Sequence, residues 1–515
     1  MKKYKLLYNL DMSGVPQVLS KERKDFIQPI SSKHIKLFAQ EVLNTGVDAF
    51  FCCPTLFRLP LWNSNIEPHW QNEAIEIIPP IDRKQWTSSE RSYFPMREYI
   101  LNGGNPIEEI YNEVKKSNTD FFFSFRMNDW HFVEFEDLVH YPTLGKFYVS
   151  HSEYRIKSSN KDNPIGWNEK NKNQSNFLIK EVRDYCFGLL SELCNNYDID
   201  GLELDFMRSP NYFPLEKIVE GREMLTDLVR EIRGMLDDIG NRRNKVIPLC
   251  VRLPHRYDYN QRLGFDIKKW TDEELVQMIN VSTSYFHSND IEIEAYKKNL
   301  PNVLIYAEEQ MLINNYINNY GWPAERRTPK EILETSAYEF KRRGADGISL
   351  FNFFCTREID QPNRDPNSIY SEPPLEVLSN ITDEKYLNGC NKHYFIYGYN
   401  DLNFGEALPS YKSTSVTMKI CENYNEYKSA KLRVVCNSVV DTTDCNITVN
   451  GKNCELLKEN DELFIETVHE GQFPKNCCVN ADLPIFILNE TNSISIDFAC
   501  ENTEIFGIEI ALYKE

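Results

Sequence analysis

The sequence predicts an α/β protein in which a closed barrel of eight parallel strands, a (β/α)8 or TIM barrel, is followed by an all-β, sandwich-like domain. Three observations predict it. Up to about residue 355, short apolar runs alternate with helical patterns, as they do where helices join parallel strands. These runs number eight, the count that closes such a barrel. After about residue 385 the helical periodicity stops and period-two alternation replaces it.

The first half of the barrel can be placed from its apolar runs and their punctuation. A helix around 33–43 ends at Gly46, and a later helix begins at Asn105-Pro106, a capping residue followed by a first-turn proline. The helix 177–194 carries an apolar stripe typical of a face packed on a sheet, made of Leu178, Val182, Cys186, Leu189 and Leu193. Strands one to four are expected at 4–11, 47–54, 119–129 and 199–208.

The second half of the barrel continues the same alternation. Before the last strand, Thr328, Pro329 and Glu331 predict an N-cap, a first-turn proline and a capping-box acid, and Gly344 predicts the end of that helix. Strands five to eight are expected at 246–254, 276–286, 303–310 and 347–355. The barrel domain is therefore expected to span residues 1–384.

Residues 385–515 are predicted to form the β-sandwich domain, with turns at Asn, Gly and Asp. Such a domain can bind carbohydrate or brace the barrel, and the sequence favours bracing because it shows no clear aromatic platform. Its clearest strands are expected at 415–420, 432–436, 447–449, 493–498 and 506–513.

Composition narrows the range of partners. The net charge is −19 without a long basic stretch, so a nucleic-acid partner is not expected.

The N-terminal run is too short and too interrupted for a signal peptide or a membrane span. The fourteen cysteines show no zinc-like spacing, which favours reduced thiols in a cytoplasmic protein without a metal or another cofactor.

Charged and polar residues gather at the carboxyl ends of the predicted strands, where barrels of this kind carry their reactive groups. Burying so many of them unpaired would be costly, which points to a functional site. In chain order they are Asp11, Arg126, Asn128, Asp129, His131, Glu203, Asp205, Arg208, Arg252, His255, Glu308, Glu309 and Asn352.

Three arginines among them suggest an anionic ligand. Arg126, Arg208 and Arg252 end three successive strands of an acidic protein, and a guanidinium holds a carboxylate with two parallel hydrogen bonds. The alternative is that each arginine neutralises a neighbouring Asp or Glu in the barrel mouth.

Two acid–base arrangements can be drawn. In one, carboxylates of strands four and seven flank a glycosidic bond, namely Glu203, Asp205, Glu308 and Glu309. In the other, Asp11 activates water and a protonated His131 donates to the leaving oxygen. The second suits an anionic sugar better, because a carboxylate nucleophile would be repelled by the substrate's own carboxylate. The alternative for His131 is a structural role, in which the histidine lies in a loop and its ring hydrogen-bonds only to backbone groups.

The runs 8–11 (YNLD), 125–131 (FRMNDWH) and 200–208 (DGLELDFMR) resemble the inverting exo-sialidases of glycoside hydrolase family 156, within a broader group of glycosyl-hydrolase-like barrels. The resemblance covers nearly the whole chain. It implies single displacement with His131 as acid and Asp11 as base, Arg208 and Asn352 on the sialic acid carboxylate, and a contribution from Arg126. It also implies a metal-independent homodimer.

The sequence therefore predicts an exo-acting hydrolase that releases a terminal acidic sugar, sialic acid first, from a sialoside or other acidic glycan. Its catalytic pair is Asp11 and His131. Two alternatives stay open: a hydrolase of another sugar, for example a uronate, that uses the paired carboxylates, and a non-catalytic carbohydrate-binding barrel. The substrate-binding candidates are Arg126, Asn128, Asp205, Arg208, Arg252, Glu308 and Asn352.

Overall fold

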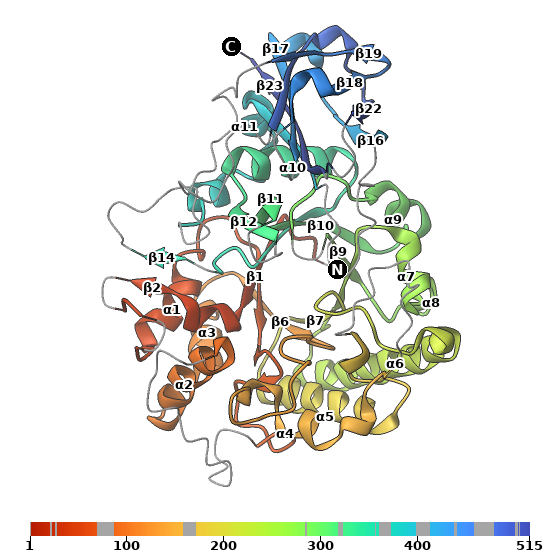
Figure 1. Cartoon of the computed structure of the whole chain (residues 1–515). Helices are drawn as coiled ribbons and strands as arrows, with labels where there is room; N and C mark the ends of the chain where they lie inside the picture. The colour runs from red at the N-terminus through yellow and green to blue at the C-terminus, as the bar shows by residue number, and fades with distance from the viewer. Residues whose placement is uncertain are drawn as a thin grey trace.

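A computed structural model confirms both predicted parts of the fold (Figure 1). Eight parallel strands close a barrel, and two antiparallel sheets follow it. The structure describes residues 2–20, 23–25, 28–68, 87–157, 171–283, 286–317, 323–355, 357–359, 372–397, 413–436, 440–457, 478–499, 503 and 505–514.

The barrel strands pair in the order β1-β13-β10-β9-β8-β7-β6-β3. Each lies inside one of the eight predicted ranges, although residues 284 and 285 of the sixth range lie outside the described residues. The strands are β1 Leu6–Asp11, β3 Ala49–Cys53, β6 Asp120–Arg126, β7 Gly201–Asp205, β8 Leu249–Pro254, β9 Met278–Ser282, β10 Leu304–Gln310 and β13 Gly347–Phe351. Short strands lie in the connections: β2 Leu19–Ser20, β4 Thr55–Leu56, β5 Leu59–Pro60, β11 Leu312–Ile317, β12 Pro323–Arg327 and β14 Glu358–Ile359.

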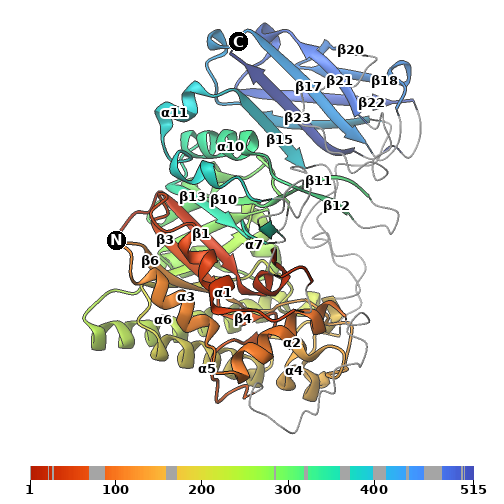
Figure 2. The same cartoon turned by 90° about the vertical axis from the view of Figure 1, so that its left-hand side faces the viewer.

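Helices surround the barrel (Figures 1 and 2). Asn105 caps α3 as predicted, since its side chain accepts a hydrogen bond from the Glu108 amide. The predicted cap at Thr328 is wrong: Pro329 occupies that position of α10, and the Thr328 hydroxyl donates instead to the Gln310 carbonyl of β10. The helices are α1 Ser32–Gln40, α2 Ser88–Leu101, α3 Pro106–Val114, α4 Lys146–Ser150, α5 Lys180–Asn196, α6 Ile218–Arg243, α7 Tyr257–Leu263, α8 Ile267–Asp272, α9 Ile293–Asn299, α10 Lys330–Arg342 and α11 Glu384–Gly389.

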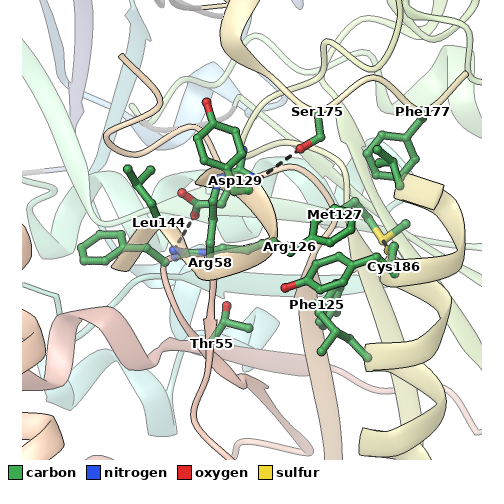
Figure 3. A pocket seen from close by; sticks show the side chains of 16 residues that line it. Thr55, Arg58, Phe125, Arg126, Met127, Asp129, Leu144, Ser175, Phe177 and Cys186 are labelled. Carbon is green, nitrogen blue, oxygen red and sulfur yellow. Dashed lines mark hydrogen bonds and ion pairs between the residues drawn. The ribbon is translucent and has the colours of Figure 1, made fainter. Parts of the chain in front are cut away.

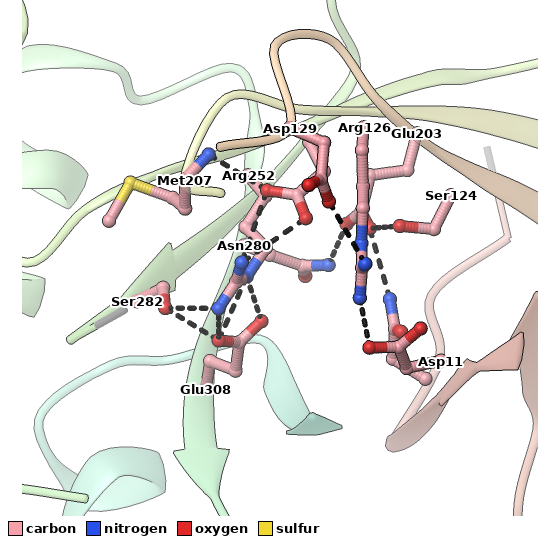
Figure 4. Close-up of polar contacts among 12 residues, drawn as sticks. Asp11, Ser124, Arg126, Asp129, Glu203, Met207, Arg252, Asn280, Ser282 and Glu308 are labelled. Carbon is pink, nitrogen blue, oxygen red and sulfur yellow. Dashed lines mark hydrogen bonds and ion pairs between the residues drawn. The ribbon is translucent and has the colours of Figure 1, made fainter. Parts of the chain in front are cut away.

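The barrel interior changes from apolar to polar along its axis. Near the strand beginnings, Phe122 and Tyr306 belong to a small apolar cluster. Gly201 has no side chain because an added Cβ would lie 1.9 Å from the Phe122 ring. Further along, Glu203 of β7 accepts hydrogen bonds from residues on β1, β6 and β9 (Figure 4). The strands therefore deliver polar side chains toward their carboxyl ends.

The C-terminal part is a sandwich with its own core. One sheet has the order β15-β23-β17-β21-β20 and the other β16-β22-β18-β19, and one apolar cluster joins their facing sides. The strands are β15 Lys392–Tyr397, β16 Ser413–Lys419, β17 Ser429–Cys436, β18 Cys445–Val449, β19 Lys452–Asn453, β20 Glu455–Leu457, β21 Cys478–Leu483, β22 Thr491–Phe498 and β23 Ile505–Tyr513.

Helix α10 lies between the barrel and this sandwich (Figure 2). The Asn289 amide donates to the Phe395 carbonyl of β15 over 2.8 Å, and the Phe395 amide donates back to Asn289 Oδ1 over 2.9 Å. The His393 amide donates to the Thr335 hydroxyl of α10 over 2.7 Å. These buried bonds hold β15 of the sandwich against the barrel domain.

No helix in the described ranges combines the length and the apolar character needed to cross a bilayer. The cysteines of those ranges are free thiols.

Candidate active site

A chain of contacts joins Asp11 to His131 at the carboxyl ends of the strands. Asp11 ends β1 and forms an ion pair with Arg126, which ends β6 (Figure 4). Arg126 Nη1 donates to Asp129 Oδ2 over 3.1 Å, and Asp129 Oδ1 lies 2.7 Å from His131 Nδ1. The structure therefore brings the two predicted catalytic residues into one network.

Asp11 is buried and held as a carboxylate. Its Oδ1 accepts from the amide of Ser13 over 2.9 Å and from the hydroxyl of Ser13 over 2.5 Å, since Asp11 caps the short helix Met12–Gln17. Burial alone would raise the pKa of Asp11, but Arg126, Arg208 and the Ser13 bonds outweigh it and lower that pKa below its ordinary value. Asp11 is therefore ionised at neutral pH.

The hydrogen bonds of His131 identify its tautomer. Arg208 Nη2 lies 3.1 Å from His131 Nε2, and a guanidinium can only donate, so Nε2 accepts and the proton sits on Nδ1. Burial lowers the pKa of His131, and Arg208 and Arg126 lower it further against the opposing effect of Asp129. The imidazole is therefore neutral at neutral pH, although its side chain is 25% exposed and so within reach of a ligand.

Three aromatic residues, Phe57, Trp130 and Phe132, flank this imidazole. The Phe57 ring lies 4.7 Å and the Phe132 ring 6.0 Å from the His131 ring, centroid to centroid. Both phenylalanines have positive φ angles, 54° and 62°, which bulky side chains rarely adopt. Backbone strain of this kind gathers at functional sites, where surrounding structure enforces it.

Arg208 differs from the other two arginines. It lies just beyond β7, and no carboxylate of the described residues is within ion-pair distance of it, although its charge lowers the pKa of Asp11 and of Asp129. Its Nε is buried without a hydrogen-bond partner. Arg208 therefore has a donor that the described residues leave unsatisfied.

Arg252 is committed to the protein. It is completely buried, with Nε 2.8 Å from Glu308 Oε2, Nη1 3.1 Å from Asp205 Oδ1 and Nη2 2.9 Å from the Ser282 hydroxyl (Figure 4). Burial raises the pKa of Glu308 even though Arg252 opposes the shift. Arg252, like Arg126, thus follows the alternative reading, in which an arginine neutralises neighbouring carboxylates.

Of the strand-four and strand-seven carboxylates, Asp205 and Glu308 share Arg252 and Glu203 lies near them, whereas Glu309 lies apart. Glu203 lies deep in the barrel, where burial raises its pKa to about 7. Glu309 follows Glu308 and so faces the other side of β10, toward Glu334 of α10. Burial raises the pKa of Glu309 well above its ordinary value, and neither of its carboxyl oxygens has a partner.

The two asparagine candidates, Asn128 and Asn352, differ in whether a side-chain amide atom is left without a hydrogen bond. Asn128 Nδ2 donates to the carbonyls of Ser175 and Asn211 over 3.1 and 2.9 Å, and its Oδ1 accepts from the Ser175 amide over 3.2 Å. Its amide is thereby occupied in joining loops. Asn352 follows β13 with φ 54°, and its Oδ1 is buried without a partner, so this oxygen remains available.

Sequence reasoning missed Arg58 and gave Asp129 no role. Arg58 lies between β4 and β5, pairs with no carboxylate of the described residues, and rests over the Tyr148 ring at 4.4 Å. Arg58 was not predicted because it lies in a hairpin beyond the second strand and not at the end of that strand. Asp129 stood among the strand-end residues, and the structure shows that it orients His131 through two contacts within the same loop.

A cavity beside this network is lined by Arg58, Arg126, Asp129 and Ser175 together with apolar side chains (Figure 3). Its volume is about 50 Å³, room for a few water molecules and too little for an organic substrate. An organic substrate of His131 must therefore lie outside this cavity.

The described residues offer no group of three His, Cys, Asp or Glu side chains arranged to hold a metal ion. The carboxylates of the mouth are paired with arginines instead.

No protein-family model and no curated protein sequence matches the chain. Among solved structures, it is similar to a cycloisomaltooligosaccharide glucanotransferase of Paenibacillus sp., at 10% identity and TM-score 0.33, over 98% of this chain and 57% of that one. A Paenibacillus chitinase aligns at 10% identity and TM-score 0.39, over 98% of this chain and 41% of that one. An Anoxybacillus α-amylase aligns at 12% identity and TM-score 0.39, over 96% and 98% of the two chains.

The chain thus spans little more than half of the first of these proteins and less than half of the second. Likeness at this level says nothing about the reaction. The resemblance to family 156 sialidases gains no support from these matches and stays a prediction of the sequence.

Proposed function

We propose that this protein is an exo-acting glycoside hydrolase that releases a terminal acidic sugar, sialic acid in the first place, with inversion at the anomeric carbon. Asp11 activates the water and His131 protonates the leaving oxygen. The observation that carries the proposal is the single network Asp11–Arg126–Asp129–His131, which gathers a carboxylate from the end of β1 and an imidazole from the loop after β6.

The charge distribution supports an anionic substrate. Arg208 has a buried Nε without a partner and no ion pair within the described part of the chain, so it can hold a carboxylate through two donors. Asn352 contributes a free amide oxygen, which can accept from a hydroxyl or amide of the sugar. Arg126 acts indirectly, because both of its neighbours are carboxylates of the network.

In the proposed reaction, the water attacks the anomeric carbon from one face while the glycosidic C–O bond breaks on the other. Asp11 accepts the proton of the water, and His131, once a second proton has bound at Nε2, donates that proton to the departing oxygen. Asp11 is suited to the base role because it is ionised, and a positively charged acid meets a negatively charged sugar without repulsion.

The carboxylates of strands four and seven are less suited to these roles. Glu308 and Asp205 are fully buried and bonded to Arg252, and Glu203 accepts from four neighbouring side chains. Asp11 is likewise buried and bonded to Arg126, so what favours it is its connection, through Arg126 and Asp129, to the partly exposed His131. The alternative, in which these carboxylates hydrolyse another sugar such as a uronate, is one of the outcomes that the experiment below distinguishes.

The experiment is hydrolysis of an aryl α-sialoside, with the anomer of the first product followed by NMR. Release of the β-anomer, lost in Asp11→Asn and in His131→Ala, is expected. His140→Ala is the matched control, because this histidine is half exposed and outside the network. Retention of configuration, or no release from any sialoside, contradicts the proposal. Activity that survives His131→Ala and fails in Glu308→Gln favours the carboxylate pair, and tight binding without turnover indicates a binding protein.

A further inference from the structure

The surroundings of His131 are asymmetric. Asp129 holds Nδ1 from the same loop, and Arg208 approaches Nε2 from the loop after β7. Arg126 reaches the ring only as a nearby charge from β6, and Asp11 is balanced by Arg126. Phe57 covers the ring without adding charge. Arg208 is therefore the only charged group among the described residues that contacts the nitrogen facing a ligand.

Arg126 and Arg208 differ in how firmly they are held. Arg126 is fixed by carboxylates on both sides, Asp11 and Asp129. Arg208 has one hydrogen bond to His131 and a buried Nε that bonds nothing. Moving Arg208 would break one hydrogen bond, whereas moving Arg126 would break two buried ion pairs.

This arrangement leaves the free protein without a proton donor. His131 Nε2 accepts from Arg208, so in this state it can give no proton to a leaving oxygen. The second proton must reach the imidazole when substrate is bound.

We propose, resting on the function proposed above, that Arg208 is a substrate-operated switch on His131. In the free protein its guanidinium occupies Nε2 and keeps the imidazole neutral. When the carboxylate of an acidic sugar takes the Nε and Nη2 donors of Arg208, Nε2 is released and binds a proton from solvent. The hydrogen bond to Asp129 keeps the other proton on His131 Nδ1, so the ring becomes an imidazolium only in the complex.

The physical reason is a change of local charge. A bound carboxylate neutralises Arg208 and adds negative charge near a ring that Asp129 already supports, and both changes favour the imidazolium. The protonation of His131 therefore depends on the negative charge of the ligand and not on its size. Arg208 and Asp129 are thus positioning residues that set the protonation state of the acid, and a neutral sugar of the same shape would bind without a proton donor.

The first test uses the free protein. With ¹⁵N-labelled histidine, and with His131 assigned by its loss in His131→Gln, the wild-type ring should show a neutral tautomer with the proton on Nδ1 at pH 7. Arg208→Gln should raise the pH at which His131 titrates. Arg262→Gln, an arginine of α7 outside the network, should leave it unchanged. A proton on Nε2 in the wild type, or an unmoved titration in Arg208→Gln, overturns the switch.

The second test adds N-acetylneuraminic acid or its methyl ester. The acid should raise the pH at which His131 titrates, and the ester should not. If the acid binds and His131 does not respond, the switch is wrong while the proposed function stands. If neither compound binds, the proposed substrate is wrong, and the free-protein test still decides whether Arg208 controls His131.

Discussion

Replacing Arg252 by methionine is a sharp test of whether this arginine belongs to the fold or to ligand binding. The guanidinium lies fully buried between Glu308 and Asp205, with five hydrogen bonds to their carboxylate oxygens and another to Ser282. Methionine keeps much of the side-chain volume and removes the charge. Two buried carboxyl groups then lose their counter-charge.

Removing one partner of a buried ion pair destabilises a protein by about 3–5 kcal/mol. The penalty should depend on pH. Burial already holds the pKa of Glu308 above its ordinary value, and loss of Arg252 raises it further. A carboxyl whose folded pKa exceeds its unfolded pKa stabilises the fold below the unfolded value and loses that effect as pH rises through the folded one. The variant should therefore be weakest near pH 7 and recover toward about pH 5.

The measurement is guanidinium unfolding of both proteins at the two pH values. Arg230→Met is the matched control, because Arg230 bonds Glu273 and Asp227 at the surface of α6, where such pairs contribute roughly 0–1 kcal/mol. Adding Glu308→Gln and Asp205→Asn to Arg252→Met should restore much of the loss. An unchanged unfolding midpoint with a raised KM would refute this reasoning and would indicate that Arg252 binds the substrate.

Three further predictions concern single residues. Glu203→Gln should change the pH dependence of unfolding, because the contribution of this carboxyl to stability falls between pH 4.5 and about 7, where the unfolded chain has lost the proton that the folded protein keeps; a variant with the same pH dependence contradicts this. Asn352→Ala should lower the unfolding free energy by about 1–2 kcal/mol more than Asn352→Gly, since its φ is 54°. Asp129→Asn should slow sialoside hydrolysis roughly 100-fold and lower the pH at which His131 titrates, whereas a purely structural Asp129 would leave that pH unchanged.

The barrel was predictable because each strand is a short apolar run between helical patterns. The sandwich was predictable only in part: β16, β17, β18, β22 and β23 overlap the predicted ranges, whereas β15, β19, β20 and β21 were not foreseen. β15 reads KHYFIY, and most of its side chains are buried against α10 and the neighbouring strands, so no alternation marks it.

The sequence alone determined which groups stand at the strand ends, because alternation along parallel strands delivers them to one rim of the barrel. It could not determine which arginine is free. Arg126, Arg208 and Arg252 look alike in the chain, and only packing assigns two of them to carboxylates and leaves the third beside His131. The tertiary structure also decided the protonation of that histidine, because burial and neighbouring charges act through space.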